Sequence, residues 1–353
     1  MIPYIFPAGT TDFSTFGLGG AGGAISCTVQ EELNGMFELE MEYPQDGEML
    51  SYLKVENYIA VEIDGLAERQ VFRIYRVTES LNNTVKLFAK HKSYELLDVP
   101  VVPVDIVEKT VAEAWDTIVS NAVEPIGYVF ATDISKTVSL NLRGESMKEA
   151  LKLLQEASKG ELKWDGNNIY LNANRGETNT NVMQYGKNII DLENELNMEG
   201  VYTHIFPYAL QTNDETITKK VILTEKVIPV PNALPLARKI ILPVDLSSEI
   251  SMDSSNLEGK LRDAATKYLA ENSDIGTIKQ SITVDIFDQR SACAEPVSGD
   301  LVYIRLGDYM GVHVPGMDLD VTLQVVSTSY NVLLDRYEEL EIGTPVKTIA
   351  DRF

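Results

Sequence analysis

One stretch alternates apolar and acidic residues without a break: Phe37-Glu38-Leu39-Glu40-Met41-Glu42-Tyr43. Successive side chains of a β-strand point to opposite faces of the sheet, so this alternation predicts a strand that is buried on one face. The next four residues, Pro44-Gln45-Asp46-Gly47, have the composition of a turn. The stretch therefore predicts that the N-terminal region folds as β-structure.

The segments that follow have the same character. Val71–Val77 is rich in β-branched and aromatic residues, and Asn82-Asn83 leads into a similar run at Thr84–Lys90. Two such runs with turn residues between them predict a hairpin. Several strands at this spacing indicate a small barrel or sandwich in the first hundred residues.

Helical periodicity begins after this β-region. Thr110 with Glu113, and Ser146 with Glu149, match the capping-box pattern, each ahead of apolar residues at helical spacing. Two short strand-like runs joined by a turn come next. Residues 99–188 are therefore interpreted as an α/β module inserted after the first β-region.

Strand-like segments return from about residue 189. A third helix is predicted at about 256–271, with Ser255 and Glu258 as its capping pair. The C-terminal third is again β. Its predicted strands are Ser281–Asp288, Leu301–Arg305, Val321–Tyr330 and Leu333–Ile342.

Charge excludes several classes of partner. The 353 residues include 30 basic and 53 acidic side chains, for a net charge of -23. Proteins that grip nucleic acid need clustered Lys and Arg, so specific binding to DNA or RNA and to anionic membranes is not expected. No apolar run reaches the ~18–20 residues that span a bilayer. The start lacks the basic n-region of a signal peptide, so we expect the chain to be made in a cytoplasm.

The residues that usually carry catalysis are few. The two cysteines, Cys27 and Cys293, fall in a predicted strand and a loop, where nothing in the sequence activates a thiolate. The three histidines, at positions 91, 204 and 313, match no zinc-binding spacing. His313 is the one that could lie near Cys293 in the fold. We therefore expect no catalytic residues, no cofactor and no metal site.

Two further patterns have a structural and a functional interpretation. Gly17, Gly19 and Gly22 fit G-x-G-x-x-G, but a strand rather than a helix follows, which favours a hairpin tip or loop over a phosphate site. Glu38, Glu40 and Glu42 form either the solvated face of a half-buried strand or one wall of an acidic pore. Several aromatic residues could form a carbohydrate platform, although core packing explains them better. They are Trp164, Tyr202, Phe206, Tyr208 and Tyr330.

Four groups of short strings resemble the N-terminal region of phage tail-associated lysins, also known as prophage endopeptidase tail proteins. The first group is Glu31-Glu32-Leu33-Asn34-Gly35 with the alternating strand and Tyr43-Pro44, and the second is Val71–Val77, Ala89-Lys90-His91 and Tyr94–Asp98. The third is Gly160–Asp165, Ile169-Tyr170-Leu171, Arg175-Gly176, Tyr185–Asn188 and Val201-Tyr202-Thr203, and the fourth is Ser281–Asp285, Gly299-Asp300 and Asn331–Tyr337. The glycine-rich stretch 17–23 departs from the family pattern.

The resemblance implies an α+β, mainly β fold like that of contractile-phage baseplate hub proteins, with two similar small β-barrels and inserted helical and α/β modules. Residues 1–98 would form the first barrel and 99–188 the α/β insert. Residues 189–239 plus 276–353 would form the second barrel. Residues 240–275 would be a helical insert that packs with the α/β module.

The resemblance also implies a structural role in the virion. Three copies would form a ring at the tail tip that closes the tail tube and later lets the tape measure protein and DNA pass. The expected partners are a homotrimer, the distal tail protein, the tape measure protein and receptor-binding or baseplate proteins, with DNA only transient. In longer relatives a lytic domain follows the hub, and here none is expected after Phe353. The alternatives are a peptidoglycan-degrading endopeptidase and a host-surface carbohydrate-binding module.

Overall fold

The computed structural model describes residues 1–184, 189–213, 216–250, 256–272, 275–286, 304–317 and 319–343. These residues form two compact units. The large unit is Met1–Glu193 together with the described residues from Ile282 onward, and the small unit is Asn194–Ser281. Each unit is described by itself.

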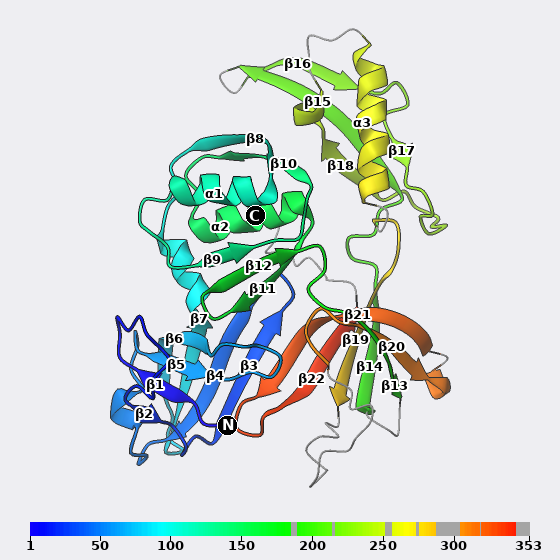
Figure 1. Cartoon of the computed structure of the whole chain (residues 1–353). Coiled ribbons are helices and arrows are strands. Elements are labelled where there is room, and N and C mark those ends of the chain that lie inside the picture. Colours follow the sequence, from blue (N-terminus) through cyan, green and yellow to red (C-terminus); the bar gives the residue numbers. More distant parts are fainter. Residues whose placement is uncertain are drawn as a thin grey trace. The chain divides into compact units, whose positions relative to one another are not determined.

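A large, mostly antiparallel sheet dominates the large unit, and the N-terminal and C-terminal strands lie side by side in it (Figure 1). The N-terminal strands are β1 (Tyr4–Phe6), β2 (Gly19–Gly20), β3 (Ser26–Glu32), β4 (Phe37–Pro44), β5 (Tyr58–Val61), β6 (Gln70–Glu79) and β7 (Thr84–His91). The later strands are β13 (Thr178–Gln184), β14 (Ile189–Asn197), β19 (Lys279–Ile286), β20 (Tyr309–Val314), β21 (Leu319–Asn331) and β22 (Arg336–Gly343). The order along the sheet is β14-β19-β22-β21-β3-β4-β7-β6-β5-β1-β2, with β20 pairing β21 and β13.

The alternating stretch is confirmed as β4. Phe37, Leu39, Met41 and Tyr43 are at most 2% exposed, whereas the glutamates between them lie on the other face. The predicted hairpin is confirmed as β6 and β7. The core therefore follows the period-2 pattern of the sequence, as expected for a sheet with one buried face.

The first β-region is joined to the last one by a single strand pair. Thr28–Glu32 of β3 pair antiparallel with Ser327–Asn331 of β21. The two strands lie about three hundred residues apart in the chain, so no local pattern could have indicated the pairing. Among the described strands we find no pair that closes a barrel, and the path stays open from β14 to β2.

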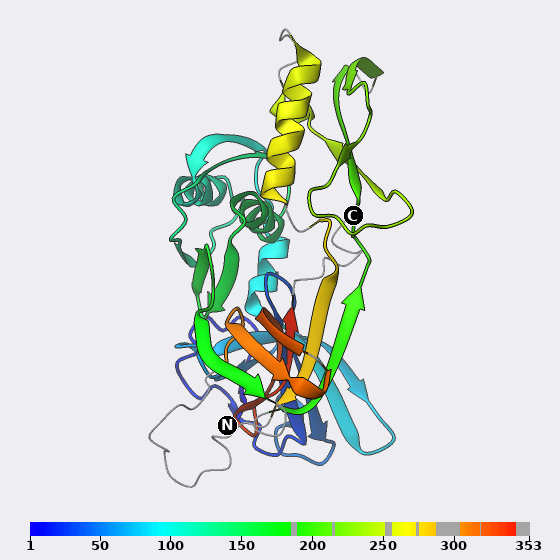
Figure 2. The same ribbon diagram turned by 90° about the vertical axis from the view of Figure 1, so that its right-hand side faces the viewer.

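The predicted α/β module consists of β8 (Val104–Thr110), α1 (Val111–Ser120), β9 (Val129–Ala131), β10 (Thr137–Leu142), α2 (Met147–Ser158), β11 (Glu161–Asp165) and β12 (Asn168–Asn172). Both predicted capping boxes are present, at Thr110 with Glu113 and at Ser146 with Glu149. The two helices lie against each other (Figure 2). Their buried faces belong to the same apolar core as the large sheet.

The small unit is a four-stranded sheet with one helix on one face (Figures 1 and 2). Its elements are β15 (His204–Asn213), β16 (Thr216–Ile222), β17 (Ile228–Pro229), β18 (Ile241–Asp245) and α3 (Leu257–Glu271). The predicted third helix is thus confirmed. Ser255 lies outside the described residues, and the capping residue is Asn256, whose side chain accepts a hydrogen bond from the Gly259 N–H.

Helix α3 and strand β15 share one apolar core in the small unit. Helix α3 packs its buried Leu261, Ala265 and Leu269 with Ile205 and Ala209 of β15. The small unit therefore contains residues from both sides of the expected boundary at 239/240. An amphipathic helix must bury its apolar stripe, and β15 supplies apolar residues that cover it.

Candidate functional site

The acidic row Glu38, Glu40 and Glu42 lies on the face of the large sheet that points away from its core. The Glu40 side chain is 50% exposed and that of Glu38 is 29% exposed. Strand β4 therefore shows the structural interpretation of the acidic row, which is the solvated face of a half-buried strand.

Lysines of the neighbouring strand β7 lie beside the row. Lys90 Nζ is 3.7 Å from Glu38 Oε1, and Lys86 Nζ is 3.5 Å from Glu40 Oε1. Glu42 also pairs with Lys86 in the strand register. Exposed ion pairs of this kind contribute little to stability, but they neutralise part of the negative charge.

The polar face continues over the C-terminal strands. Side chains of directly paired residues point to the same side of a sheet, so the register places polar residues of β3, β21 and β22 beside the glutamates. One row across the strands is Glu38, Gln30, Ser329 and Glu339, and the next is Glu40, Thr28, Asn331 and Arg336. We call these two rows, with Glu42, Lys86 and Lys90, the outward polar face.

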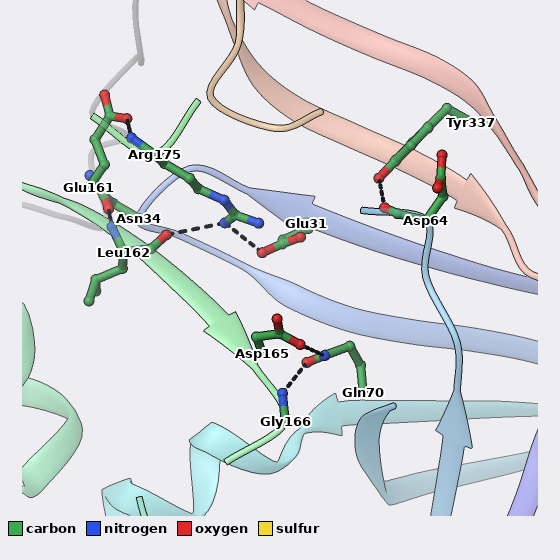
Figure 3. Close-up of polar contacts among 10 residues, drawn as sticks. All are labelled: Glu31, Asn34, Asp64, Gln70, Glu161, Leu162, Asp165, Gly166, Arg175 and Tyr337. Atoms are coloured by element: carbon green, nitrogen blue, oxygen red, sulfur yellow. Dashed lines mark hydrogen bonds and ion pairs between the residues drawn. The ribbon is translucent and has the colours of Figure 1, made fainter. Parts of the chain in front are cut away.

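A buried ion pair fixes the α/β module to this sheet. Arg175 Nη1 lies 2.7 Å from Glu31 Oε1 on β3, and the two side chains are only 6% and 8% exposed (Figure 3). Arg175 also donates to the carbonyl of Leu162 on β11 and, through its backbone N–H, to Glu161 Oε2. The pair therefore links strand β11 to the centre of the large sheet.

Polar contacts beside the pair strengthen the same junction. Asn34 Oδ1 accepts from the Leu162 N–H at 2.7 Å, and Asn34 Nδ2 donates to the carbonyl of Gly160 (Figure 3). Gln324 Nε2 of β21 donates to Glu161 Oε1 at 2.7 Å. Both the N-terminal and the C-terminal parts of the sheet hold the strand.

The far end of the β11–β12 hairpin is held separately. Asp165 accepts hydrogen bonds from the backbone N–H groups of Ala67 and Glu68, and Gln70 exchanges hydrogen bonds with Asp165 and Gly166 (Figure 3). The hairpin is thus anchored at both ends. These contacts attach the α/β module to the sheet within the large unit.

The sequence of the chain matches a known protein family. A model of the family described as prophage endopeptidase tail matches residues 177–353, which is half of the chain. The chain belongs to the prophage endopeptidase tail family. The predicted resemblance is thereby confirmed. No curated protein matches the sequence.

Three solved tail proteins share the fold over nearly the full length of both chains. Prophage tail protein gp18 from Listeria monocytogenes EGD-e is 13% identical, with a TM-score of 0.62, and the match covers 99% of this chain and 96% of that one. The 43 kDa tail protein of prophage MuSo2 from Shewanella oneidensis is 15% identical, with a TM-score of 0.60 and 98% coverage of both chains. The tail protein from Neisseria meningitidis MC58 is 12% identical, with a TM-score of 0.58 and coverage of 97% and 96%.

The family's description as endopeptidase makes the nucleophiles worth locating. Cys27 lies in β3, is fully buried, and burial raises the pKa of its thiol to about 12. Cys293 lies outside the described residues, so its predicted proximity to His313 stays untested. The His313 side chain is 42% exposed and lies 3.8 Å from Asp320. In the described part of the chain, no three potential ligands come together as a metal site.

No sequence pattern indicated the cluster in which Lys148 of α2 lies beside Ser93 and Trp164. Lys148 Nζ donates to Ser93 Oγ at 2.9 Å and lies 4.6 Å from the centre of the Trp164 ring. Burial lowers the pKa of Lys148 to about 8. In some hydrolases a lysine activates a serine nucleophile, but here Ser93 is fully buried.

His91 belongs to the same buried cluster. Its ring stacks on Phe37, and its Nδ1 accepts a hydrogen bond from the Ser93 N–H. Burial, followed by the nearby charges of Lys148 and Lys92, holds the pKa of His91 well below its usual range. His91 is therefore a neutral core residue.

The aromatic positions do not form one platform. Trp164 and Tyr330 are buried in the large unit, whereas Phe206 and Tyr208 lie in the small unit. The rings of Phe206 and Tyr208 are 5.7 Å apart, on the face of β15 opposite the buried Ile205 and Ala209.

In the part of the chain that the structure describes, no helix is long and apolar enough to cross a membrane.

Proposed function

We propose that this chain is the structural hub subunit of a phage tail tip, in which three copies form a ring. The ring would close the tail tube and later let the tape measure protein and DNA pass. The observation that carries the proposal is the outward polar face, which runs without a break over strands from both ends of the chain. Membership of the family and the fold shared with three tail proteins support it.

The charge of this face suits the lining of a channel for DNA. On strands β3, β4, β7, β21 and β22 the face as defined has four glutamates against two lysines and one arginine, and Arg73 and Arg76 of β6 border it beside Lys90 and Phe88. The glutamates would repel passing phosphates. A basic lining would bind the DNA backbone and slow its passage. Glu38, Glu40 and Glu42 are proposed as channel-lining residues on this ground.

We further propose that the C-terminal strands close a second β-barrel. The two similar barrels of each of the three copies would then pack around the ring with pseudo-sixfold symmetry. The partners would be two further copies, the distal tail protein, the tape measure protein and receptor-binding or baseplate proteins. The site of action would be the virion tail tip, after synthesis in the host cytoplasm. No catalytic residue or cofactor takes part.

The test is the mass of the purified chain by light scattering, followed by electron microscopy of the same sample. A ring of three gives about three times 39.2 kDa and shows a central hole. A monomer at every concentration that also fails to bind the distal tail protein of the same phage would contradict the proposal.

A second candidate function, peptidoglycan endopeptidase, is favoured only by the description of the family. Incubation with purified cell wall should release new amino groups if this function is correct. No release beyond that of a boiled sample would argue against it.

A third candidate, a carbohydrate-binding module, is favoured by the neighbouring rings of Phe206 and Tyr208. Binding to a glycan array that is lost in Phe206→Ala would support it. An array without a reproducible signal would remove it.

A further inference from the structure

The first thirty residues are almost free of charge. Asp12 is the single charged side chain among residues 1–30, in a chain with 30 basic and 53 acidic residues. Much of this segment is nevertheless at the surface, including residues 14–18 without interruption. A neutral surface on a chain of charge -23 needs an explanation, because charged residues normally cover such positions.

Residues 4–20 of this segment contain the last two strands of the large sheet, β1 and β2. Strand β2 pairs with β1, and the order of the sheet ends there. The glycine-rich stretch permits this close pairing. Gly17 has φ +57°, and a Cβ on it would lie 2.3 Å from the carbonyl oxygen of Ile5. A Cβ on Gly20 would lie 2.7 Å from Ile2 Cγ2. The glycines thus allow β2 to lie close to β1 at the edge of the sheet, and this explains them without a phosphate site.

Apolar side chains are exposed along this edge. Phe16 is 67% exposed, Ile2 50% and Leu18 38%. Ile2 lies over Gly20, and Phe16 lies against the ring of Tyr4 at 5.3 Å between ring centres. We call Ile2, Phe16, Leu18 and strand β2 the N-terminal edge. An exposed apolar sheet edge is a site where another chain binds.

The side chain of Arg69 holds the loop that carries Phe16 in place. Arg69 Nη1 donates to the carbonyls of Phe13 and Thr15, and its guanidinium stacks 4.6 Å from the centre of the Tyr4 ring. Glu62 holds the same guanidinium through Arg69 Nε at 3.2 Å. Phe16 is therefore presented in an ordered position, which lowers the entropy lost on binding. Buried aromatic anchors carry much of the affinity of protein interfaces.

We propose that the N-terminal edge binds a second copy of this chain, an inference that rests on the proposed trimeric ring. Two copies of charge -23 repel each other over most of their surfaces. The N-terminal edge is a place where they can approach without bringing like charges together. A basic partner protein, in contrast, would be attracted electrostatically to the acidic surface, and a neutral edge would add nothing to that attraction.

The test compares two variants by light scattering over a range of concentrations. Phe16→Glu with Leu18→Glu places two carboxylates on the N-terminal edge. The matched control, Leu81→Glu with Val107→Glu, places two carboxylates at exposed positions outside the edge, in the turn between β6 and β7 and on β8. We expect the dissociation constant of the trimer to rise by at least about 30-fold in the double variant, as for the loss of a hot spot, and to stay unchanged in the control.

The outcomes separate the two proposals. A wild-type trimer that the double variant leaves intact at every concentration overturns the assignment of the edge and leaves the ring standing. A wild-type monomer at every concentration overturns both. If the double variant does not fold, as judged by circular dichroism, Phe16→Ser gives the same comparison without added charge.

Discussion

Arg175 and Glu31 form an ion pair with 2.7 Å between Nη1 and Oε1, although 144 positions separate them in the sequence. Both side chains are almost fully buried. Removing one partner of such a pair leaves the other charge in an apolar surrounding without compensation. The pair is therefore one of the contacts that attach the α/β module to the sheet.

We expect Arg175→Met to lower the free energy of unfolding by about 3–5 kcal/mol, because Glu31 stays buried without its partner. Urea denaturation followed by circular dichroism measures the loss. Arg143→Met is the control, because the Arg143–Asp105 pair is more than half exposed and should be worth less than about 1 kcal/mol. Equal effects in the two variants would show that burial of the pair does not matter.

The stability of the protein should rise between pH 8 and pH 10.5 because of Lys148. Burial lowers the pKa of Lys148 from 10.5 to about 8 in the folded state. Below pH 8 both states carry the proton, so the full cost of burying the charge is present. The cost falls as the folded state loses its proton above pH 8, and the gain is about 1–3 kcal/mol by pH 10.5.

Lys148→Met should flatten this rise, since the variant keeps most of the aliphatic chain and has no proton to lose. Urea denaturation at a series of pH values gives the two curves. Lys86→Met is the control, because the Lys86 side chain is about half exposed, and it should leave the slope as in the wild type. A slope that Lys148→Met does not change would assign the pH dependence to other groups.

Cys27 should resist alkylation in the folded protein. Its thiol is fully buried and burial raises its pKa to about 12, so almost no thiolate forms at pH 8. We expect labelling by iodoacetamide to be at least about 100-fold slower than in urea. Peptide mass spectrometry separates this site from Cys293. Rapid labelling of Cys27 in the native state would contradict the burial of β3.

Gly17→Ala should destabilise the protein by about 2 kcal/mol or more, because the left-handed φ is strained for alanine and the new Cβ meets the Ile5 carbonyl. Gly127→Ala is the control, since no atom lies within 4 Å of its added Cβ. Thermal unfolding compares the two. A Gly17→Ala protein as stable as the wild type would mean that β2 does not lie against β1 as described.

Reversing the charge of the acidic row should slow DNA ejection from assembled tails. In the triple variant Glu38→Lys, Glu40→Lys and Glu42→Lys, the basic side chains would bind passing phosphates, and added salt should restore the rate. The control is Asp116→Lys, Glu124→Lys and Glu156→Lys, an equal charge change at exposed positions of the α/β module. Equal slowing by the two variants would remove the channel assignment.

Local patterns predicted the local structure well. The alternation at Phe37–Tyr43 gave strand β4, and the pairs Thr110–Glu113 and Ser146–Glu149 gave the starts of α1 and α2. Capping and period-2 burial depend on residues within a few positions of each other, so a sequence window contains the necessary information.

The grouping of segments into domains stays a prediction, because local patterns do not show which apolar faces pack together. Residues 240–275 were expected as a helical insert that packs with the α/β module, and within the small unit α3 shares one core with β15. The helical period of α3 shows that the helix has an apolar side and does not show which apolar face will cover it.

The sequence by itself determined the β-rich class, the positions of the helices, the family and the N-terminal segment in which Asp12 is the single charged side chain. Only the tertiary structure decided that β3 pairs with β21, that Arg175 reaches Glu31, and that the part-buried Lys148 donates to Ser93. These contacts join residues far apart in the chain. Their partners are selected by the free energy of burying whole faces against one another, which no short window of sequence contains.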